Sequence, residues 1–245
     1  MTQIVSQNEI DLIIGTNHHD PYQVLGAHEC EQEGKKIVAV RAFLPDAVKA
    51  EVIDLNTGTA FKMEKLHDAG FFESVITERT EVFPYRIKSY YENGASAEFY
   101  DSYAFMPTVG EMDQYYFSQG NHHELYEKLG AHIRYFDYFK DKLGGVSFAV
   151  WAPNARRVSV IGDFNRWDGR RHVMRSLGTS GVWEIFIPGL QTGQNYKFEI
   201  KTKDGALLEK CDPFAFYAEV RPKTASKIYD LSGYNWEDGE WMNWF

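Results

Sequence analysis

The loop that starts at Gly162 holds the side chains best suited to bind a sugar. An apolar stretch ends there, and polar residues then surround the indole of Trp167. These neighbours are Asp163, Asn165 and Asp168. A flat indole can stack on the apolar face of a pyranose ring, while amides and carboxylates hydrogen-bond to its hydroxyl groups. The indole could instead pack back over the edge of its own domain, so the local pattern leaves both interpretations open.

Paired carboxylates and paired histidines are the other candidates for chemistry. The pairs are Asp163 with Asp168, Glu237 with Asp238, His18 with His19, and His122 with His123. We interpret the carboxylates as solvated loop residues. The histidines are adjacent, whereas a helical metal site places two histidines four positions apart. The chain also has no Cys-x-x-Cys, phosphate-loop or Gly-x-Ser-x-Gly motif. We therefore expect no catalytic residue, no metal and no cofactor.

The elements that position these side chains occur twice in the sequence. Five short segments recur in the same order, between 104 and 111 positions further on. They are 25–28 with 129–132, 41–47 with 149–155, 70–73 with 181–184, 84–87 with 195–198, and 100–105 with 211–216. A period near 110 residues is too long for a solenoid repeat and fits a whole domain. We predict a first module over 1–108, a connector over 109–124, a second module over 125–232, and a further segment from 233 to 245.

Each copy consists of short alternating strands separated by turns, which predicts an all-β fold of two tandem immunoglobulin-like β-sandwiches with short connecting helices. The predicted strands are 37–43, 50–55, 71–76, 85–91 and 98–100, then 146–151, 158–161, 182–187 and 196–201. A short helix over 8–14 is predicted from Ser6 as its cap, Glu9 at the capping-box position and Gly15 as its end. A second helix is predicted over 121–129, ended by Gly130.

The composition excludes several classes of partner. Aromatic residues make up 16% of the chain, which favours strands. The formal net charge of −9 argues against nucleic acids and anionic membranes, since both call for basic patches. No stretch reaches the ~18 apolar residues needed to span a bilayer. A neutral polysaccharide is indifferent to this charge.

Cysteine usage and the N-terminus indicate a cytoplasmic protein. Cys30 and Cys211 fall in different modules, so we expect two free thiols, which suit a reducing compartment. The first 17 residues lack the basic and long apolar regions of a secretory signal peptide.

The second copy resembles carbohydrate-binding module family 48. The resemblance rests on Phe-Ala-Val-Trp-Ala-Pro-Asn-Ala at 148–155, Gly-Asp-Phe-Asn-Arg-Trp-Asp-Gly at 162–169, Gly-Val-Trp-Glu at 181–184 and Tyr-Lys-Phe at 196–198. More narrowly, residues 125–132 and 221–226 resemble bacterial glycogen branching enzymes. Residues 19–28 resemble the extra N-terminal module of the long-form enzymes. The resemblance covers nearly the whole chain.

The resemblance implies which side chains contact glucan. They are Trp167, Lys197 and Thr224, to which we add Asn165 from the local pattern of the loop. Glycogen-binding relatives carry a second tryptophan just after the glycine of the following hairpin, where this chain has Ala206. They also carry an asparagine where this chain has Ser226. Half of the stacking platform is therefore missing, and we expect weak binding at this site.

The resemblance also implies a division of labour within a larger enzyme. Branching enzymes resemble the α-amylase superfamily, in which a carboxylate nucleophile and a carboxylic acid/base act at the rim of a (β/α)8 barrel. Such a barrel alone needs about 250 residues, so the chain is expected to be inactive alone. We expect it to be the non-catalytic N-terminal region of a glycogen branching enzyme. That enzyme cuts an α-1,4-glucan chain and transfers it to a 6-hydroxyl to form an α-1,6 branch.

Within that enzyme, the region is expected to bind or position α-glucan, as glycogen, amylose or amylopectin, and to buttress the barrel. The surface that faces the barrel should expose apolar side chains, with 217–220 and 234–245 as candidates. Two alternatives remain open. One is a stand-alone glycogen-binding or regulatory adaptor without transferase activity. The other is a tandem immunoglobulin-like adhesion protein, against which the missing signal peptide and the lack of paired cysteines count.

Overall fold

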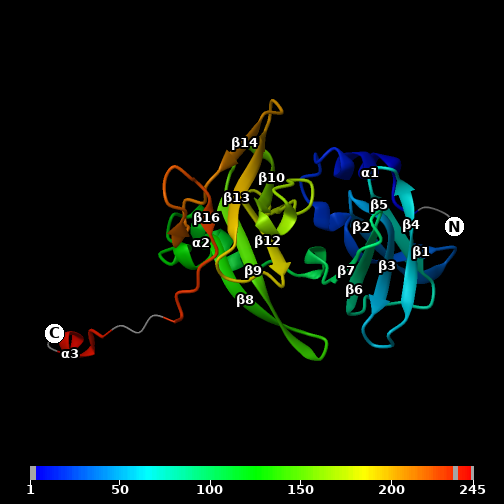
Figure 1. The fold of residues 1–245 in the computed structure, drawn as a ribbon, viewed down its shortest axis with the longest axis horizontal. Helices are drawn as coiled ribbons and strands as arrows, with labels where there is room; N and C mark the ends of the chain where they lie inside the picture. Colours follow the sequence, from blue (N-terminus) through cyan, green and yellow to red (C-terminus); the bar gives the residue numbers. More distant parts are fainter. Residues whose placement is uncertain (1–3, 234–236, 244–245) are drawn as a thin grey trace.

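The computed structural model describes residues 4–233 and 237–243, which form two β-sandwiches lying side by side (Figure 1). The predicted all-β class, two immunoglobulin-like sandwiches with short helical segments, is confirmed. In this described part of the chain, no helix is long and apolar enough to cross a membrane. Cys30 and Cys211 are free thiols.

The first sandwich is an antiparallel sheet of seven strands that folds over on itself, in the order β1-β2-β5-β4-β3-β6-β7. Strand β4 pairs with β3 through its first half and with β5 through its second, and the register shifts between Lys65 and His67. The two halves of the sheet thereby enclose a core that includes Val40, Phe72 and Ile87. The strands are β1 (Gly26–Gln32), β2 (Lys35–Phe43), β3 (Ala47–Asp54), β4 (Ala60–His67), β5 (Phe71–Ile76), β6 (Tyr85–Tyr91) and β7 (Ser96–Phe99).

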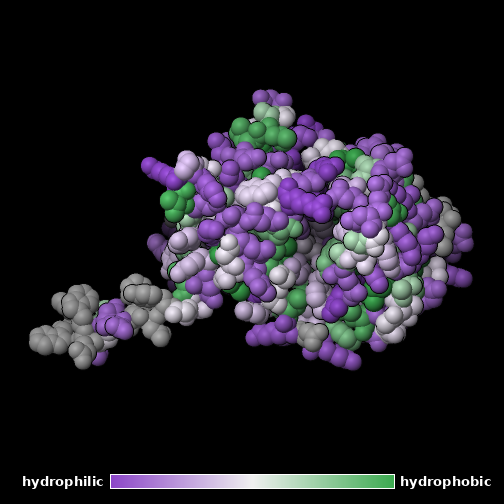
Figure 2. Space-filling view, viewed as in Figure 1, coloured by the Kyte–Doolittle hydropathy of each residue, from purple (hydrophilic) through white to green (hydrophobic). Residues whose placement is uncertain are grey.

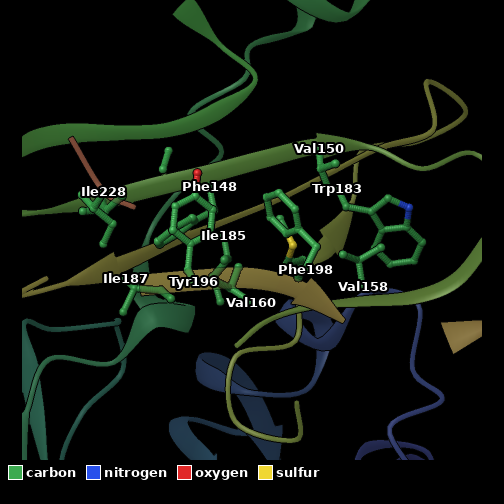
Figure 3. Close-up of a cluster of buried hydrophobic side chains, with 13 residues drawn as sticks. Phe148, Val150, Val158, Val160, Trp183, Ile185, Ile187, Tyr196, Phe198 and Ile228 are labelled. Atoms are coloured by element: carbon green, nitrogen blue, oxygen red, sulfur yellow. The ribbon is translucent and has the colours of Figure 1, made fainter. Parts of the chain in front are cut away.

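The second sandwich packs two antiparallel sheets against each other. One has the order β11-β12-β9-β8, and the other has the order β10-β13-β16-β15, with β14 also paired to β13. Along β13, Tyr196 and Phe198 point into the core between the sheets (Figure 3). Lys197, between them in the sequence, is only partly buried. The strands are β8 (Gly130–Tyr138), β9 (Asp141–Trp151), β10 (Ala155–Gly162), β11 (Arg175–Ser176), β12 (Val182–Pro188), β13 (Asn195–Thr202), β14 (Leu207–Lys210), β15 (Tyr217–Ala218) and β16 (Ser226–Lys227).

The first predicted helix is confirmed and the second is wrong. Helix α1 (Gln7–Ile14) begins at Ser6, whose hydroxyl accepts a hydrogen bond from the backbone of Glu9 at 3.3 Å. The carboxylate of Glu9 lies 2.8 Å from His18 Nε2. Over 121–129 the chain forms only a 3-10 turn, and the helix lies earlier, as α2 (Glu111–Ser118). This helix has no buried residue, so it offers no apolar stripe to detect.

The remaining helical segments are single turns. They are η1 (Pro21–Gln23), η2 (Ser102–Ala104), η3 (Leu125–Glu127), η4 (Asp163–Asn165) and α3 (Gly239–Met242). Turns η1 and η3 occupy matching places in the two copies, each just before the first strand of its sandwich. The glycine that opens each of those strands, Gly26 or Gly130, has a positive φ of 93° or 101°. Residues other than glycine rarely adopt such a backbone angle.

The internal repeat is visible as a matching pair of buried hydrogen bonds. The hydroxyl of Tyr85 donates to Asp101 at 2.7 Å, and that of Tyr196 donates to Asp212 at 2.5 Å. In both copies the other carboxylate oxygen accepts a bond from the backbone N–H two residues further on. Both pairs are buried, so each copy closes its end of the sandwich in the same way.

A buried glutamate also recurs and fastens the chain segment that enters each sandwich. Glu73 accepts a hydrogen bond from Arg41 at 2.8 Å and another from the backbone N–H of Ile4 at 3.4 Å. Glu184 occupies the matching place and accepts a bond from Arg175 at 2.6 Å. Its second oxygen accepts the backbone N–H of Thr108 at 2.8 Å and that of Val109, the first residue of the predicted connector, at 3.4 Å. Charged groups this deeply buried are stable only when they are paired.

The two sandwiches contact each other directly. The guanidinium of Arg175 lies 3.7 Å from the centre of the Tyr22 ring. The hydroxyl of Tyr103 donates to the carbonyl of Val173 at 3.3 Å. From the β8–β9 hairpin, the hydroxyl of Tyr138 accepts a backbone N–H of β6 at 3.1 Å. The first sandwich is therefore held against the second at several places.

Candidate functional site

The loop that contains Trp167 follows β10 and is shaped from within by Asn165. The amide oxygen of Asn165 accepts the N–H of Gly162 at 2.9 Å, and its nitrogen donates to the carbonyl of Val160 at 2.8 Å. The same nitrogen lies 2.9 Å from His172 Nδ1. Asn165 is only 3% exposed. Its amide therefore serves the loop, which argues against the direct glucan contact expected from the sequence.

His172 is a neutral partner for that amide. Burial, together with the nearby charge of Arg171, lowers the pKa of His172 to about 4. At neutral pH its unprotonated Nδ1 can accept the hydrogen bond from Asn165. The loop is thus closed by two uncharged side chains, of which Asn165 is buried and His172 is half-buried.

Trp167 lies at the surface with its N–H already bonded. The indole is 37% exposed, and its Nε1 donates to Asp163 at 3.2 Å. Its backbone N–H donates to the carbonyl of Gly162 at 3.0 Å. Both Arg166 and Trp167 have a φ of 59°, a left-handed conformation that costs about 1–2 kcal/mol for each such residue. Strained backbone of this kind concentrates at functional sites.

Lys197 is brought close to that indole. Its ammonium lies 6.0 Å from the centre of the Trp167 ring and 3.2 Å from the carboxylate of Glu209. Thr224 is exposed and precedes β16, which pairs with the start of β13. Since β10 pairs with the opposite edge of β13, Lys197 lies between the strand that leads to Trp167 and the strand that follows Thr224.

Asp168 and Arg170, which follow Trp167, form an ion pair with each other. Arg170 donates to both oxygens of Asp168, with distances from 2.8 to 3.2 Å. Burial alone would raise the pKa of Asp168, but these bonds to Arg170 lower it below its usual value. Within 4–233 and 237–243, no group of His, Cys, Asp and Glu side chains is placed to hold a metal ion.

Comparison with known proteins shows which family the chain belongs to. Residues 6–103 match the family described as alpha-1,4-glucan branching enzyme GlgB, N-terminal domain, and residues 128–215 match carbohydrate-binding module 48 (isoamylase N-terminal domain). The chain is 48% identical to the 1,4-alpha-glucan branching enzyme GlgB of Thermosynechococcus vestitus over 239 residues. It is 44% identical to that of Rubrobacter xylanophilus over 237 residues. The chain belongs to the N-terminal region of the branching enzyme family.

The alignments cover nearly all of this chain but less than a third of the length of the two relatives. The alignments span 97% and 96% of this chain, and 30% and 31% of the two enzymes. Among solved structures, a pullulanase from Anoxybacillus sp. LM18-11, complexed with maltotetraose, covers 81% of the chain. Its identity to the chain is 18%, and the TM-score is 0.35.

The β13–β14 hairpin carries no indole at the position where the resemblance led us to expect one. Ala206 occupies that position, and Leu207 and Leu208 follow it with exposed side chains. These leucines form part of the apolar surface at the tip of the hairpin (Figure 2). Ser226 is buried and accepts the backbone N–H of Asp212 at 2.9 Å, so it faces the core.

The branching-enzyme region also exposes aromatic side chains near its C-terminal end. Tyr217 and Val220 are exposed, which confirms the exposure expected of 217–220. The rings of Tyr217 and Tyr229 stack 5.4 Å apart. A groove of about 320 Å³ runs beside them, lined by Tyr126 and Phe216 among others. Of the second candidate, residues 234–236 and 244–245 lie outside the described residues.

Proposed function

We propose that the chain is the non-catalytic N-terminal region of a glycogen branching enzyme, and that its second sandwich binds α-1,4-glucan at the Trp167 loop. The whole enzyme would cut an α-1,4-glucan chain and transfer it to a 6-hydroxyl, forming an α-1,6 branch. The observation that carries this proposal is the exposed indole of Trp167, fixed through its N–H and backbone beside Lys197. Residues 1–108 and 125–232 would be the two working units, joined by 109–124, in a cytoplasmic protein.

The geometry supports a simple binding mode. A glucose ring would stack on the free face of the Trp167 indole, and the Lys197 ammonium would donate hydrogen bonds to its hydroxyls. Thr224 would add a hydroxyl from the other edge of β13. With a single aromatic platform, the affinity for one glucan chain is weak. A glycogen particle presents many chains at once, so several weak contacts reinforce each other.

The substrate class is tested by retention of the 245-residue chain on glycogen, amylopectin and amylose. Trp167→Ala should lower retention at least about tenfold, since it removes the stacking platform. Trp151→Ala is the matched control, because Trp151 is also exposed but bonds through its indole N–H to Ser180, away from the loop. Equal retention of the wild type and Trp167→Ala would refute binding at this loop. An equal loss in Trp151→Ala would show that the effect is not specific to the Trp167 loop and would also contradict the proposal.

We further propose that the exposed aromatic groove supports the rest of the enzyme. The relatives extend well beyond the aligned region, which is about 30% of their length. Exposed apolar patches rimmed by polar residues usually mark interaction sites. The groove is rimmed by Glu127, Arg134 and Asp230, so it combines both features.

A further inference from the structure

The Trp167 loop is tied to the first sandwich through one carboxylate. Asp46 lies in the turn between β2 and β3, more than a hundred positions before the loop. Arg171 donates a hydrogen bond to Asp46 Oδ2, and the guanidinium of Arg166 lies 3.8 Å from the same oxygen. These two arginines stand on either side of Trp167 in the sequence. The platform of the second sandwich is thus bracketed by contacts to the first.

The backbone of the Trp167 loop is strained, so contacts from the first sandwich would help to hold its conformation. Arg166 and Trp167 are both held in the left-handed conformation, which residues with side chains avoid unless their surroundings impose it. Inside the loop, Arg171 has a competing partner, since its Nε lies 3.6 Å from Asp168. Without Asp46, Arg171 is free to turn fully toward Asp168. That movement would displace the segment that carries the indole.

We propose that Asp46 is a positioning residue for glucan binding by the neighbouring sandwich. It holds Arg171 and Arg166, and so keeps the Trp167 indole in place beside Lys197. This inference rests on the proposed function of the loop. It gives the first sandwich a role at a binding site to which it contributes no stacking ring.

The ion pair between Asp46 and Arg171 should make glycogen binding depend on salt, although the ligand itself is uncharged. Binding of uncharged glucan to an indole has no reason to depend on salt, whereas a partly exposed carboxylate–guanidinium pair weakens as salt screens it. The Asp46 side chain is 41% exposed, so it is open to screening. Retention of the wild type on glycogen should therefore fall as salt is raised, and Asp46→Asn should remove that dependence.

The experiment compares the 245-residue chain with three variants. Asp46→Asn should weaken glycogen retention about two- to tenfold at low salt and shift the indole ¹H–¹⁵N resonance of Trp167, which Trp167→Phe assigns. Asp68→Asn is the matched control, an exposed aspartate of the same sandwich, and should change neither quantity.

Each failure has its own pattern. An unchanged indole resonance in Asp46→Asn would overturn the inference, and so would a shifted resonance with unchanged, salt-dependent retention. If the wild type itself does not bind glycogen, the proposed function fails and the role of Asp46 in glucan binding fails with it. That case is distinguished from the others because it shows in the wild type before any variant is measured.

Discussion

A buried tyrosine–aspartate pair closes each sandwich, and its carboxylate lies in an unusual electrostatic environment. Burial raises the pKa of Asp101 to about 6, although bonds from the backbone of Tyr103 and the hydroxyl of Tyr85 favour its charged form. Burial likewise raises the pKa of Asp212 in the second copy. In both sandwiches, then, the carboxyl group holds its proton more tightly in the folded state than in the unfolded chain.

The sign of the resulting pH dependence follows from linkage. Because the folded pKa of Asp101 lies above the unfolded value of 3.8, its contribution to stability is complete below about pH 4 and is lost as the pH rises through about 6. Relative to Asp101→Asn, the wild type should lose up to about 3 kcal/mol of unfolding free energy between about pH 4 and pH 7. Urea titrations across that range measure the difference. A difference that stays constant with pH would contradict the raised pKa.

At the scale of elements, the buried glutamates fasten the segments that enter each sandwich. Glu184 is fully buried and joins three parts of the chain. It pairs with Arg175 of β11, and it accepts the backbone N–H and the hydroxyl of Thr108 at 2.8 and 2.7 Å. The junction between the first module and the connector is therefore attached to β12 by a charged group that has no access to water.

Breaking this pair should be costly. Glu184→Gln leaves the Arg175 guanidinium buried without its counter-charge, which should lower the unfolding free energy by about 3–5 kcal/mol. Combining it with Arg175→Met should recover part of that loss, because no unpaired charge then remains. Glu98→Gln, which breaks an exposed pair with Arg86, should change stability by less than about 1 kcal/mol. Chemical denaturation would contradict this account if the single and double variants were equally unstable.

Elements with a strong alternating pattern were predictable from the sequence, and those defined by their partners were not. Strand β6 has the bounds predicted for it, and the strands predicted over 37–43 and 182–187 are correct to within two residues. Strands β15 and β16 are two residues long, and β14 is exposed at every position, so none shows a period. Helix α2 was missed for the same reason.

The residues of the candidate site were also only partly predictable from the sequence. Trp167 and Lys197 were both expected as glucan contacts from the family resemblance, and the structure brings them together. The inward-facing role of Asn165 was not expected. Asp46 carried no signal, because nothing in a sequence shows that a turn in one copy meets a loop in the next. Contacts between domains depend on their relative orientation, which local patterns do not encode.

At the scale of the whole molecule, the two sandwiches carry matching residues in two separate grooves. Tyr22 and His28 of the first sandwich line a groove of about 710 Å³ that the second sandwich borders with Tyr138 and Arg175. The matching residues of the second sandwich, 104 positions later, line the groove beside Phe216. There, Tyr126 is 53% exposed. The repeat therefore predicts that this second groove is also a docking surface.

This docking surface should be detectable in solution. Phe216→Ser combined with Tyr229→Ser should lower the fluorescence of a dye that binds apolar surfaces, with little change in stability, because both side chains are already exposed. Tyr115→Ser, on the exposed face of α2, is the control and should leave the signal nearly unchanged. A monodisperse monomer with no dye signal in the wild type would contradict the prediction.

The contact between Tyr22 and Arg175 also has a consequence for synthesis. The first sandwich leaves the ribosome before the residues that cover it exist, and about 70 residues separate its end from Arg175. At a synthesis rate of roughly 5–20 residues per second, the inner face stays open to water for roughly 4–14 s. Tyrosine side chains on this face can stay hydrated during that time, because their hydroxyl groups form hydrogen bonds with water. The hydroxyl of Tyr103 bonds to water until it meets the carbonyl of Val173, whereas a leucine there would invite aggregation throughout the wait.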